Sequence, residues 1–179
     1  MDLHADVDWI TATVEEFEGP LVRYTARITG DLERARDVVQ DTFMKLWKQP
    51  REAVDGHLAE WLFTVCRHGA LDVRRKETRM NPSPDVGATT VAGPETDPAA
   101  SVAADEAHTR LLQLMGTLPE SQQEVLRLKF QNGLSYGEIG QITKRTANHV
   151  GVLIHTGLKT LRAKAALRYP AGLAGGSPS

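Results

Sequence analysis

Cysteine is scarce in this sequence, and long apolar runs are missing from it. The chain has 179 residues and one cysteine, Cys66, which cannot form an internal disulfide. A single thiol is typical of a reducing compartment, so we expect a cytoplasmic protein. No uninterrupted apolar run is long enough to cross a bilayer, and no basic N-terminal region precedes an apolar one. We therefore expect neither membrane insertion nor a signal peptide.

Motifs for catalysis, metal binding and phosphate binding are also missing. None of the six histidines stands at a metal-ligand spacing from Cys66 or from a nearby carboxylate. His68 and Asp72 lie four residues apart, but such a pair on a helix is more often a surface contact than a site. The sequence has no glycine-rich phosphate loop and no nucleophile elbow. We expect no catalytic residue, no metal, no cofactor and no enzymatic activity.

The apolar residues recur at helical spacing, without a strand pattern or an internal repeat. A composition of 41% hydrophobic and 25% charged residues is ordinary for a soluble globular protein. Over residues 80–102 proline, glycine and small residues replace the apolar pattern, which predicts a flexible linker. The sequence therefore predicts an all-α fold with two small helical domains, residues 1–79 and 103–168. A disordered tail is expected over residues 169–179.

Three helices are predicted in the first domain, over residues 9–28, 32–47 and 58–79. Gly30 should end the first helix as a C-cap, and Asp31 should cap the second. The first should break at Gly19–Pro20, because proline removes a helix hydrogen bond. A loop is expected over residues 49–60. The spacing places several large apolar residues of the second and third helices in the core: Val38, Phe43, Leu46, Trp47, Trp61 and Cys66.

The stretch from Leu134 to Arg162 predicts two helices joined by a tight turn. Ser135 and Glu138 form a capping box at the start of the first helix, which should end near Thr143. Thr146 is the expected N-cap of the second helix, and an apolar stripe of helical period runs along it. The stripe consists of Val150, Ile154, Leu158, Leu161 and Ala165.

Positive charge gathers at this end of the chain. No Asp or Glu occurs after Glu138, although the whole chain has a net charge of −2. A nucleic-acid surface must therefore be local, not a uniformly basic coat. A short helix, a tight turn and a basic second helix are the pattern of a DNA-binding helix-turn-helix. The alternative is a plain helical hairpin with a solvated basic face.

Three segments of the chain resemble conserved regions of bacterial RNA polymerase sigma factors. The second region of that family resembles LVRYTARITGDLERARDVVQDTFMKLW and, at its end, WLFTVCRHGALDVRRKE. The fourth region resembles LMGTLPESQQEVLRLKFQNGLSYGEIGQITKRTANHVGVLIHTGLKTLRAK. The two regions stand in the right order with only a linker between them. That arrangement is similar to the small two-domain factors called extracytoplasmic-function (ECF) sigma factors.

The resemblance implies bacterial core RNA polymerase as a partner. In the family, helices of the second region bind the clamp coiled coil of the polymerase. An amphipathic helix with a mixed-charge outer face suits docking onto another helix. The resemblance implies that the polymerase-binding residues are Asp37, Gln40, Asp41, Lys45 and Trp47. The apolar residues of this helix fit the core as well, and Trp47 is named under both interpretations.

Promoter DNA is the second implied partner. The family melts the proximal promoter element and holds its non-template strand, and single strands bind in positive grooves with pockets for unstacked bases. The resemblance assigns this work to the loop over residues 49–60 and to the basic helix after it. The candidates on that helix are Arg67, His68, Arg74, Arg75 and Lys76. His68 stands where the family often has Asn.

The helix-turn-helix should read the distal promoter element in the major groove, with its second helix entering N-terminus first. Asn148 and His149 would then meet base edges, and basic residues would contact the phosphate backbone. The full set of distal-element candidates is Lys144, Arg145, Thr146, Asn148, His149, His155, Lys159 and Arg162.

This chain departs from the family pattern in the middle of the recognition helix. Many relatives carry Lys and Arg where it has Gly151, Val152 and Leu153. Such a helix either reads DNA weakly or uses an exposed apolar patch to dock a protein, for example an inhibitory anti-sigma factor. The sequence thus predicts a sigma factor that directs core polymerase to specific promoters. The alternatives are a helix-turn-helix regulator that binds duplex DNA alone and a sigma-like adaptor that acts through protein contacts.

Overall fold

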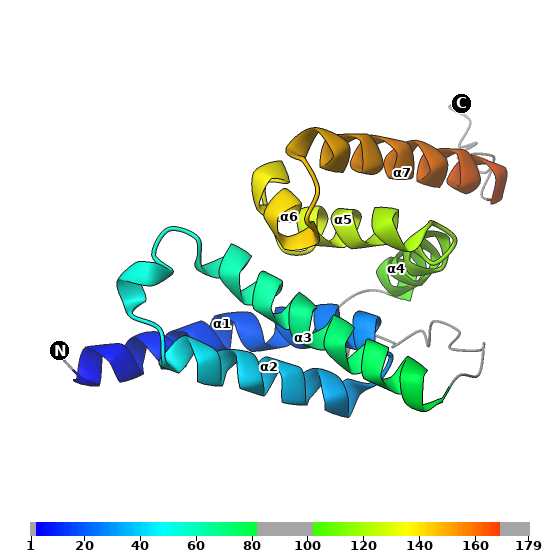
Figure 1. Cartoon of the computed structure of the whole chain (residues 1–179). Coiled ribbons are helices and arrows are strands. Elements are labelled where there is room, and N and C mark those ends of the chain that lie inside the picture. The colour runs from blue at the N-terminus through cyan, green and yellow to red at the C-terminus, as the bar shows by residue number, and fades with distance from the viewer. Residues whose placement is uncertain (1–2, 82–101, 169–179) are drawn as a thin grey trace. The chain divides into compact units, whose positions relative to one another are not determined.

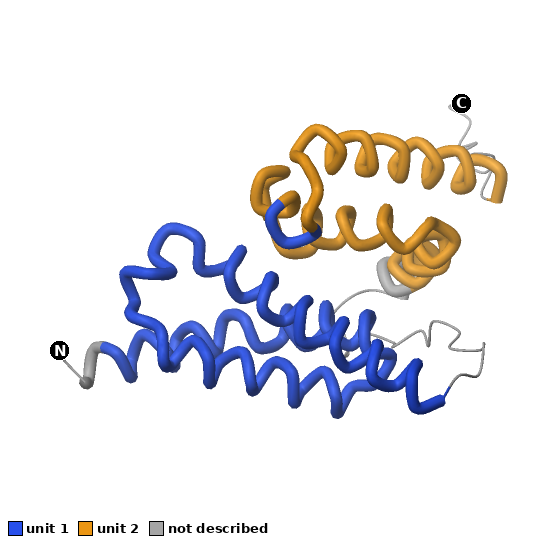
Figure 2. Tube along the Cα trace, in the orientation of Figure 1, with its two compact units in different colours: residues 1–94, 141–143 blue, residues 95–140, 144–179 orange. Residues whose placement is uncertain are grey.

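The structure is a computed structural model that describes residues 3–81 and 102–168. The chain divides into two units, coloured separately in Figure 2. The first holds the N-terminal helices, the second holds most of the C-terminal ones, and residues 141–143 are grouped with the first. All the regular structure within the described ranges is helical, so the all-α prediction is confirmed.

Three long helices, each packed against the other two, form the first unit (Figure 1). They are α1 (Leu3–Thr29), α2 (Leu32–Trp47) and α3 (Leu58–Met80), with a short 3-10 helix, η1 (Arg51–Ala53), between the last two. The buried residues between them include Leu21, Leu46, Leu62 and Phe63. The rings of Tyr24 and Phe63 meet edge to face at 5.3 Å between centroids. That geometry is a favourable one for aromatic pairs.

The predicted break at Gly19–Pro20 is wrong, because α1 continues through Pro20 to Thr29. Proline removes one hydrogen bond, here to the carbonyl of Glu16, and Glu16 is exposed, so water can hydrate that oxygen. Beyond the proline, Leu21 and Tyr24 are buried in the bundle core. Packing on both sides of Pro20 therefore holds the helix together.

A two-residue turn reverses the chain between α1 and α2. Gly30 has a φ of 72°, a left-handed conformation that glycine adopts without strain. The Asp31 carboxylate then accepts a hydrogen bond of 2.9 Å from the Arg34 amide and caps α2. Both roles were expected from the sequence pattern that starts the second helix, and both are confirmed.

The remaining helices belong to the second unit, apart from residues 141–143 of α6. They are α4 (Val102–Met115), α5 (Glu120–Phe130), α6 (Tyr136–Thr143) and α7 (Ala147–Arg168). Helix α7 packs against α4 and α5. Its buried residues Val150 and Ile154 belong to the core together with Val125 and Leu128 of α5. The Lys164 ammonium donates to the Thr117 hydroxyl at 2.8 Å, which ties the end of α7 to the turn before α5.

The predicted linker and tail lie outside the described residues, apart from the linker's ends. Met80 closes α3, Asn81 follows it, and Val102 begins α4. Helix α3 thus ends one residue after position 79, and α4 begins one residue before position 103.

Candidate functional site

The outer face of α2 carries the predicted polymerase-binding residues. Gln40 and Asp41 follow Asp37 by three and four residues, so all three share one face, and all are exposed. Lys45 and Trp47 are exposed on the two flanks of that face. The structure thus brings the five predicted residues together on one surface, and their role stays a prediction.

Trp47 does not belong to the core, contrary to one of the two sequence interpretations. Its side chain is 53% exposed, whereas Val38 and Leu46 of the same helix are buried, as expected, and Phe43 is half-buried. Trp47 lies at the last position of α2, one residue beyond the buried Leu46. A helix turns by about 100° per residue, and this step carries the indole out of the bundle.

Met44 is a candidate that sequence reasoning missed. It is 57% exposed and lies three residues after Asp41 and four after Gln40, in the middle of the same outer face. Its spacing from these two polar residues was the signal that could have found it. With Trp47 it gives the charged face of α2 two large apolar side chains, of the kinds that protein interfaces favour.

The loop between α2 and α3 is shorter and more ordered than predicted. The sequence indicated residues 49–60, but η1 occupies Arg51–Ala53 and α3 begins at Leu58. Val54 is buried and anchors the loop to the bundle. The Arg51 guanidinium lies 5.5 Å from the ring centroid of Trp9, a cation–π distance. Trp61, expected in the core, is half-buried.

The basic end of α3 presents four of its five predicted residues to solvent. His68, Arg74, Arg75 and Lys76 are exposed, and Arg67 is half-buried. Two turns of helix separate Arg67 from Arg74 and His68 from Arg75, so these four form two adjacent lines. Lys76 lies about 100° further round the helix. Arg75 forms an ion pair with Asp72 on the same helix.

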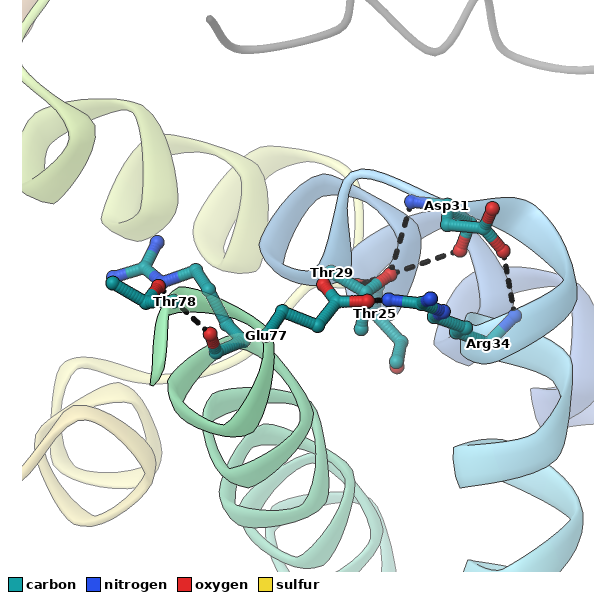
Figure 3. Close-up of polar contacts among 7 residues, drawn as sticks. Thr25, Thr29, Asp31, Arg34, Glu77 and Thr78 are labelled. Atoms are coloured by element: carbon teal, nitrogen blue, oxygen red, sulfur yellow. Dashed lines mark hydrogen bonds and ion pairs between the residues drawn. The ribbon is translucent and has the colours of Figure 1, made fainter. Parts of the chain in front are cut away.

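An ion pair holds this basic end against α2. Glu77 turns inward from α3 and pairs with Arg34, in the first turn of α2 (Figure 3). The same end of α2 is fixed by Asp31, whose amide donates to the Thr29 hydroxyl at 3.3 Å. The Arg34 and Glu77 side chains are 49% and 34% exposed, so solvent screens the pair and its stabilisation is small, about 0.2–1 kcal/mol. The pair joins the end of α3 that carries the arginines to the first turn of α2.

Helices α6 and α7 form the predicted helix-turn-helix. The Ser135 amide donates to the Glu138 carboxylate at 2.7 Å, and the Glu138 amide donates to the Ser135 hydroxyl at 3.2 Å. This is the predicted capping box. Lys144 ends α6 in the left-handed region, with φ 55° and ψ 47°. The amide of His149 donates to the Thr146 hydroxyl at 3.1 Å, so Thr146 caps α7 as predicted.

The outer face of α7 presents most of the distal-element candidates. The exposed ones, including those on the turn before the helix, are Lys144, Thr146, Asn148, His149, His155, Lys159 and Arg162. Helix α7 contains no acidic residue. Arg145 differs from the others because it is half-buried and its guanidinium lies 3.9 Å from the Glu124 carboxylate of α5. Its position therefore suits bracing the turn as much as contacting a phosphate.

The expected apolar patch at Gly151–Leu153 is not formed as a patch. Val152 is 58% exposed, but Gly151 and Leu153 are half-buried. A Cβ atom at Gly151 would lie 3.4 Å from Cε2 of Tyr136, so the glycine faces α6 and not solvent. The protein-docking alternative required three exposed residues in a row. Only Val152 of these three is exposed, so the basis for a docking patch is reduced to one side chain.

Cys66 is buried among the helices of the first unit. Its Sγ lies 3.3 Å from the Thr42 hydroxyl. Burial raises the pKa of the thiol from 9.0 to about 11, outweighing the Thr42 hydrogen bond, which lowers it. Such a thiol stays protonated and unreactive at neutral pH. Cys66 therefore serves as a small core side chain, as predicted.

No group of three or more His, Cys, Asp or Glu side chains within residues 3–81 and 102–168 comes close enough to hold a metal ion. In the same part of the chain, no helix combines the length and the apolar character that crossing a membrane requires.

Two family models match this chain, one on each helical unit. The family model for sigma-70 region 2 matches residues 13–80, which include α2, α3 and most of α1. The model for sigma-70 region 4 matches residues 108–161, which include α5, α6 and most of α7. The chain belongs to the sigma-70 family. The resemblance of its two helical regions to sigma factor regions is thereby confirmed.

Curated relatives place this sigma factor in the ECF group. An ECF RNA polymerase sigma factor of Mycobacterium tuberculosis, SigL, is 29% identical over 163 residues, covering 88% of this chain and 89% of the relative. The RNA polymerase sigma factor YlaC of Bacillus subtilis is 28% identical over 155 residues, covering 83% and 87% of the two chains. Both alignments span the two helical regions and the segment between them.

A solved structure has the same fold. The sigma factor RpoE of Bartonella quintana, determined in complex with the anti-sigma factor NepR, aligns with a TM-score of 0.67 at 21% identity. The alignment covers 89% of this sigma factor and 97% of that chain. Helical units of this kind, in this order, are therefore an established architecture.

Proposed function

We propose that this chain is an ECF sigma factor that binds core RNA polymerase and directs it to specific promoters. The observation that carries the proposal is the pair of sigma-70 matches, over residues 13–80 and 108–161, on two separate helical units. In this proposal, residues 1–79 form the polymerase-binding domain and residues 103–168 the distal-element domain, with a linker over 80–102 and a tail over 169–179.

The outer face of α2 is the proposed polymerase contact. Asp37, Gln40 and Asp41 supply polar and acidic groups, while Met44 and Trp47 supply apolar area that is already free of the bundle core. A large aromatic side chain that becomes fully buried in an interface often contributes 2 kcal/mol or more to binding, by order of magnitude. Trp47 is therefore the expected anchor of the contact.

The basic end of α3 is the proposed site for the melted proximal element. Two adjacent lines of basic side chains can follow the phosphates of one strand, because single strands bind to positive grooves. His68 and Arg75 occupy the outermost line, and Arg67 and Arg74 flank it. The Arg34–Glu77 pair joins this end of α3 to the first turn of α2.

Helix α7 is the proposed reader of the distal element. Thr146 caps its N-terminus, and Asn148 and His149 follow in the first turn, where a recognition helix meets base edges. Lys159 and Arg162 are exposed about three to four turns further along and suit phosphate contacts. The absence of acidic residues from α7 favours approach to DNA over its whole length.

Other parts of the proposal follow from this role. An anti-sigma factor is a proposed regulator, because the structural relative from Bartonella quintana was determined in complex with one. The proposed activity makes and breaks no covalent bond in the chain, so we propose a non-enzymatic factor that works in the cytoplasm, where bacterial RNA polymerase acts.

Run-off transcription with purified bacterial core polymerase tests the function. The chain and core together should produce transcripts from defined start sites on genomic DNA of the source organism, whereas core alone should not. A gel shift without polymerase separates the main rival: a helix-turn-helix regulator would bind duplex promoter DNA alone, and a sigma factor should bind it poorly. Polymerase association without any change in start sites would contradict the proposal.

Variants of α2 test the polymerase contact separately. Trp47→Ala and Met44→Ala should weaken binding to core polymerase. Leu32→Ala is the matched control, since Leu32 is another exposed apolar residue of α2 and lies about 18 Å away from Met44 along the helix axis. If all three variants bind core polymerase as tightly as the wild type does, the outer face of α2 is not part of the interface.

A further inference from the structure

Val152 is an apolar side chain in the middle of the polar outer face of α7. It is 58% exposed. One turn before it on the same face lie Asn148 and His149, and one turn after it lie His155 and Thr156, all of them exposed. Val152 therefore occupies the centre of the surface that the proposed function turns toward the major groove.

Packing within the protein does not account for this position. The buried stripe of α7 is supplied by Val150, Ile154 and Gly157. Gly151 faces Tyr136 of α6, and Leu153 is half-buried, so neither extends the apolar area around Val152. A single valine among polar neighbours is too small for a protein-docking patch, but it is the right size to contact one methyl group.

The major groove offers one kind of apolar group on base edges, the 5-methyl of thymine. Valine suits contact with it for a second reason. A β-branched side chain in a helix strongly prefers one χ1 rotamer, so the two methyl groups of Val152 are held in place before DNA arrives. Little side-chain entropy is then lost on binding.

We propose that Val152 is a specificity-determining residue that recognises the 5-methyl group of one thymine in the distal promoter element. The proposal rests on the proposed role of α7 in reading that element. Asn148 and His149 specify neighbouring bases by hydrogen bonds, and Val152 adds a contact that distinguishes thymine from cytosine and from uracil. An apolar residue in place of a basic one thus narrows sequence choice and does not simply weaken binding.

The test begins with the complete holoenzyme. Core polymerase with the wild-type chain selects active promoters from a library randomised upstream of the start site, which defines the distal element. Each thymine of that element, on either strand, is then replaced singly by deoxyuridine, and holoenzyme binding is measured by competition. The methyl removed is about one buried carbon group, so the contacted thymine should show about a fourfold loss of affinity. Other thymines should show none.

Val152→Ala supplies the decisive comparison. It should lose a similar factor on the thymine promoter and should be indifferent to deoxyuridine at the contacted position, because both changes remove the same contact. Leu167→Ala is the control, since Leu167 is 85% exposed at the far end of α7 and should keep the wild-type preference. Circular dichroism checks that both variants fold.

Each outcome bears on a different claim. If selection yields no distal element, the proposed function of α7 is wrong and this inference is lost with it. If an element emerges but no thymine responds to deoxyuridine, the assignment of Val152 is overturned while the function stands. The assignment is also overturned if Val152→Ala lowers holoenzyme affinity equally for the thymine and deoxyuridine promoters, so that the variant loses as much affinity on deoxyuridine substitution as the wild type does.

Discussion

Replacing Lys144 by glycine should stabilise the second unit while weakening its hold on DNA. Lys144 has a φ of 55° at the end of α6, where its amide donates to the Gly140 carbonyl. A side chain in that left-handed conformation costs about 1–2 kcal/mol. Glycine removes the strain but loses about 0.5–1 kcal/mol more conformational entropy on folding. The expected net gain is therefore about 0.5–1 kcal/mol.

A matched variant isolates the backbone contribution. Lys144→Ala removes the same ammonium group as Lys144→Gly but leaves a Cβ in the left-handed conformation. The glycine variant should therefore melt about 2–8 °C above the alanine variant, since 1 kcal/mol shifts a domain of this size by about 4–8 °C. The two variants should bind promoter DNA with the same reduced affinity, because each loses one proposed phosphate contact. The magnitude of the slope of log affinity against log salt concentration should decrease by about one in both.

The chain contains an internal reference for the melting experiment. Its three tryptophans are Trp9, Trp47 and Trp61, and all of them lie in α1, α2 and α3. Tryptophan fluorescence therefore follows the first unit, while far-ultraviolet circular dichroism follows the helices of both. The substitution at Lys144 should move the second signal and leave the first unchanged. A glycine variant no more stable than the alanine variant would refute the strain argument.

Three other predictions concern stability and polymerase binding. Gly151→Ala should stabilise the second unit by up to about 1 kcal/mol, measured as a higher melting temperature. The new Cβ would meet Tyr136 at an ordinary contact distance of 3.4 Å, and alanine favours the helix more than glycine does. The free energy of unfolding should fall by up to about 2–3 kcal/mol as pH rises from about 9 to about 11. The reason is that the Cys66 thiol ionises from pKa 9.0 in the unfolded chain and only near 11 in the folded chain. In urea titrations over this pH range, Cys66→Ala should lack that contribution to the fall in stability. Met44→Ala and Trp47→Ala should change stability by no more than about 0.5 kcal/mol in the same titrations, as exposed residues do, while pull-down of core polymerase declines.

Local sequence signals predicted the helix ends well. The capping box at Ser135, the caps at Asp31 and Thr146, and the left-handed Gly30 all depend on residues within a few positions of one another. Sequence can show such interactions directly, because their partners are fixed by spacing. The break predicted at Pro20 failed for the opposite reason. Whether a helix survives a proline depends on burial elsewhere in the bundle, and that burial involves residues of α2 and α3.

Candidate surface residues were harder to assign, because spacing alone cannot separate a core position from an exposed one at the edge of an apolar stripe. Trp47 fitted both interpretations, and Met44 was overlooked among apolar neighbours. Arg145 was grouped with its basic neighbours until the structure placed it beside Glu124 of α5. An ion pair between two helices cannot be read from local spacing. Lys144 and Arg145 are adjacent in sequence, yet Lys144 is exposed while Arg145 lies beside Glu124 of α5.

The large apolar side chains on the outer faces of α2 and α7 are surrounded by polar or charged residues, which lets them contribute to binding without lowering solubility. Met44 and Trp47 stand among charged residues on α2, and Val152 stands among polar residues on α7. Met44 and Trp47 are neighbours on α2 but have charged residues around them, and Val152 has only polar neighbours, so neither surface forms the broad patch that would promote aggregation. Burial of each requires a partner whose shape and polarity match its surroundings. The charged and polar neighbours thus set the partner's position, and the apolar side chain adds binding energy only when that position is correct.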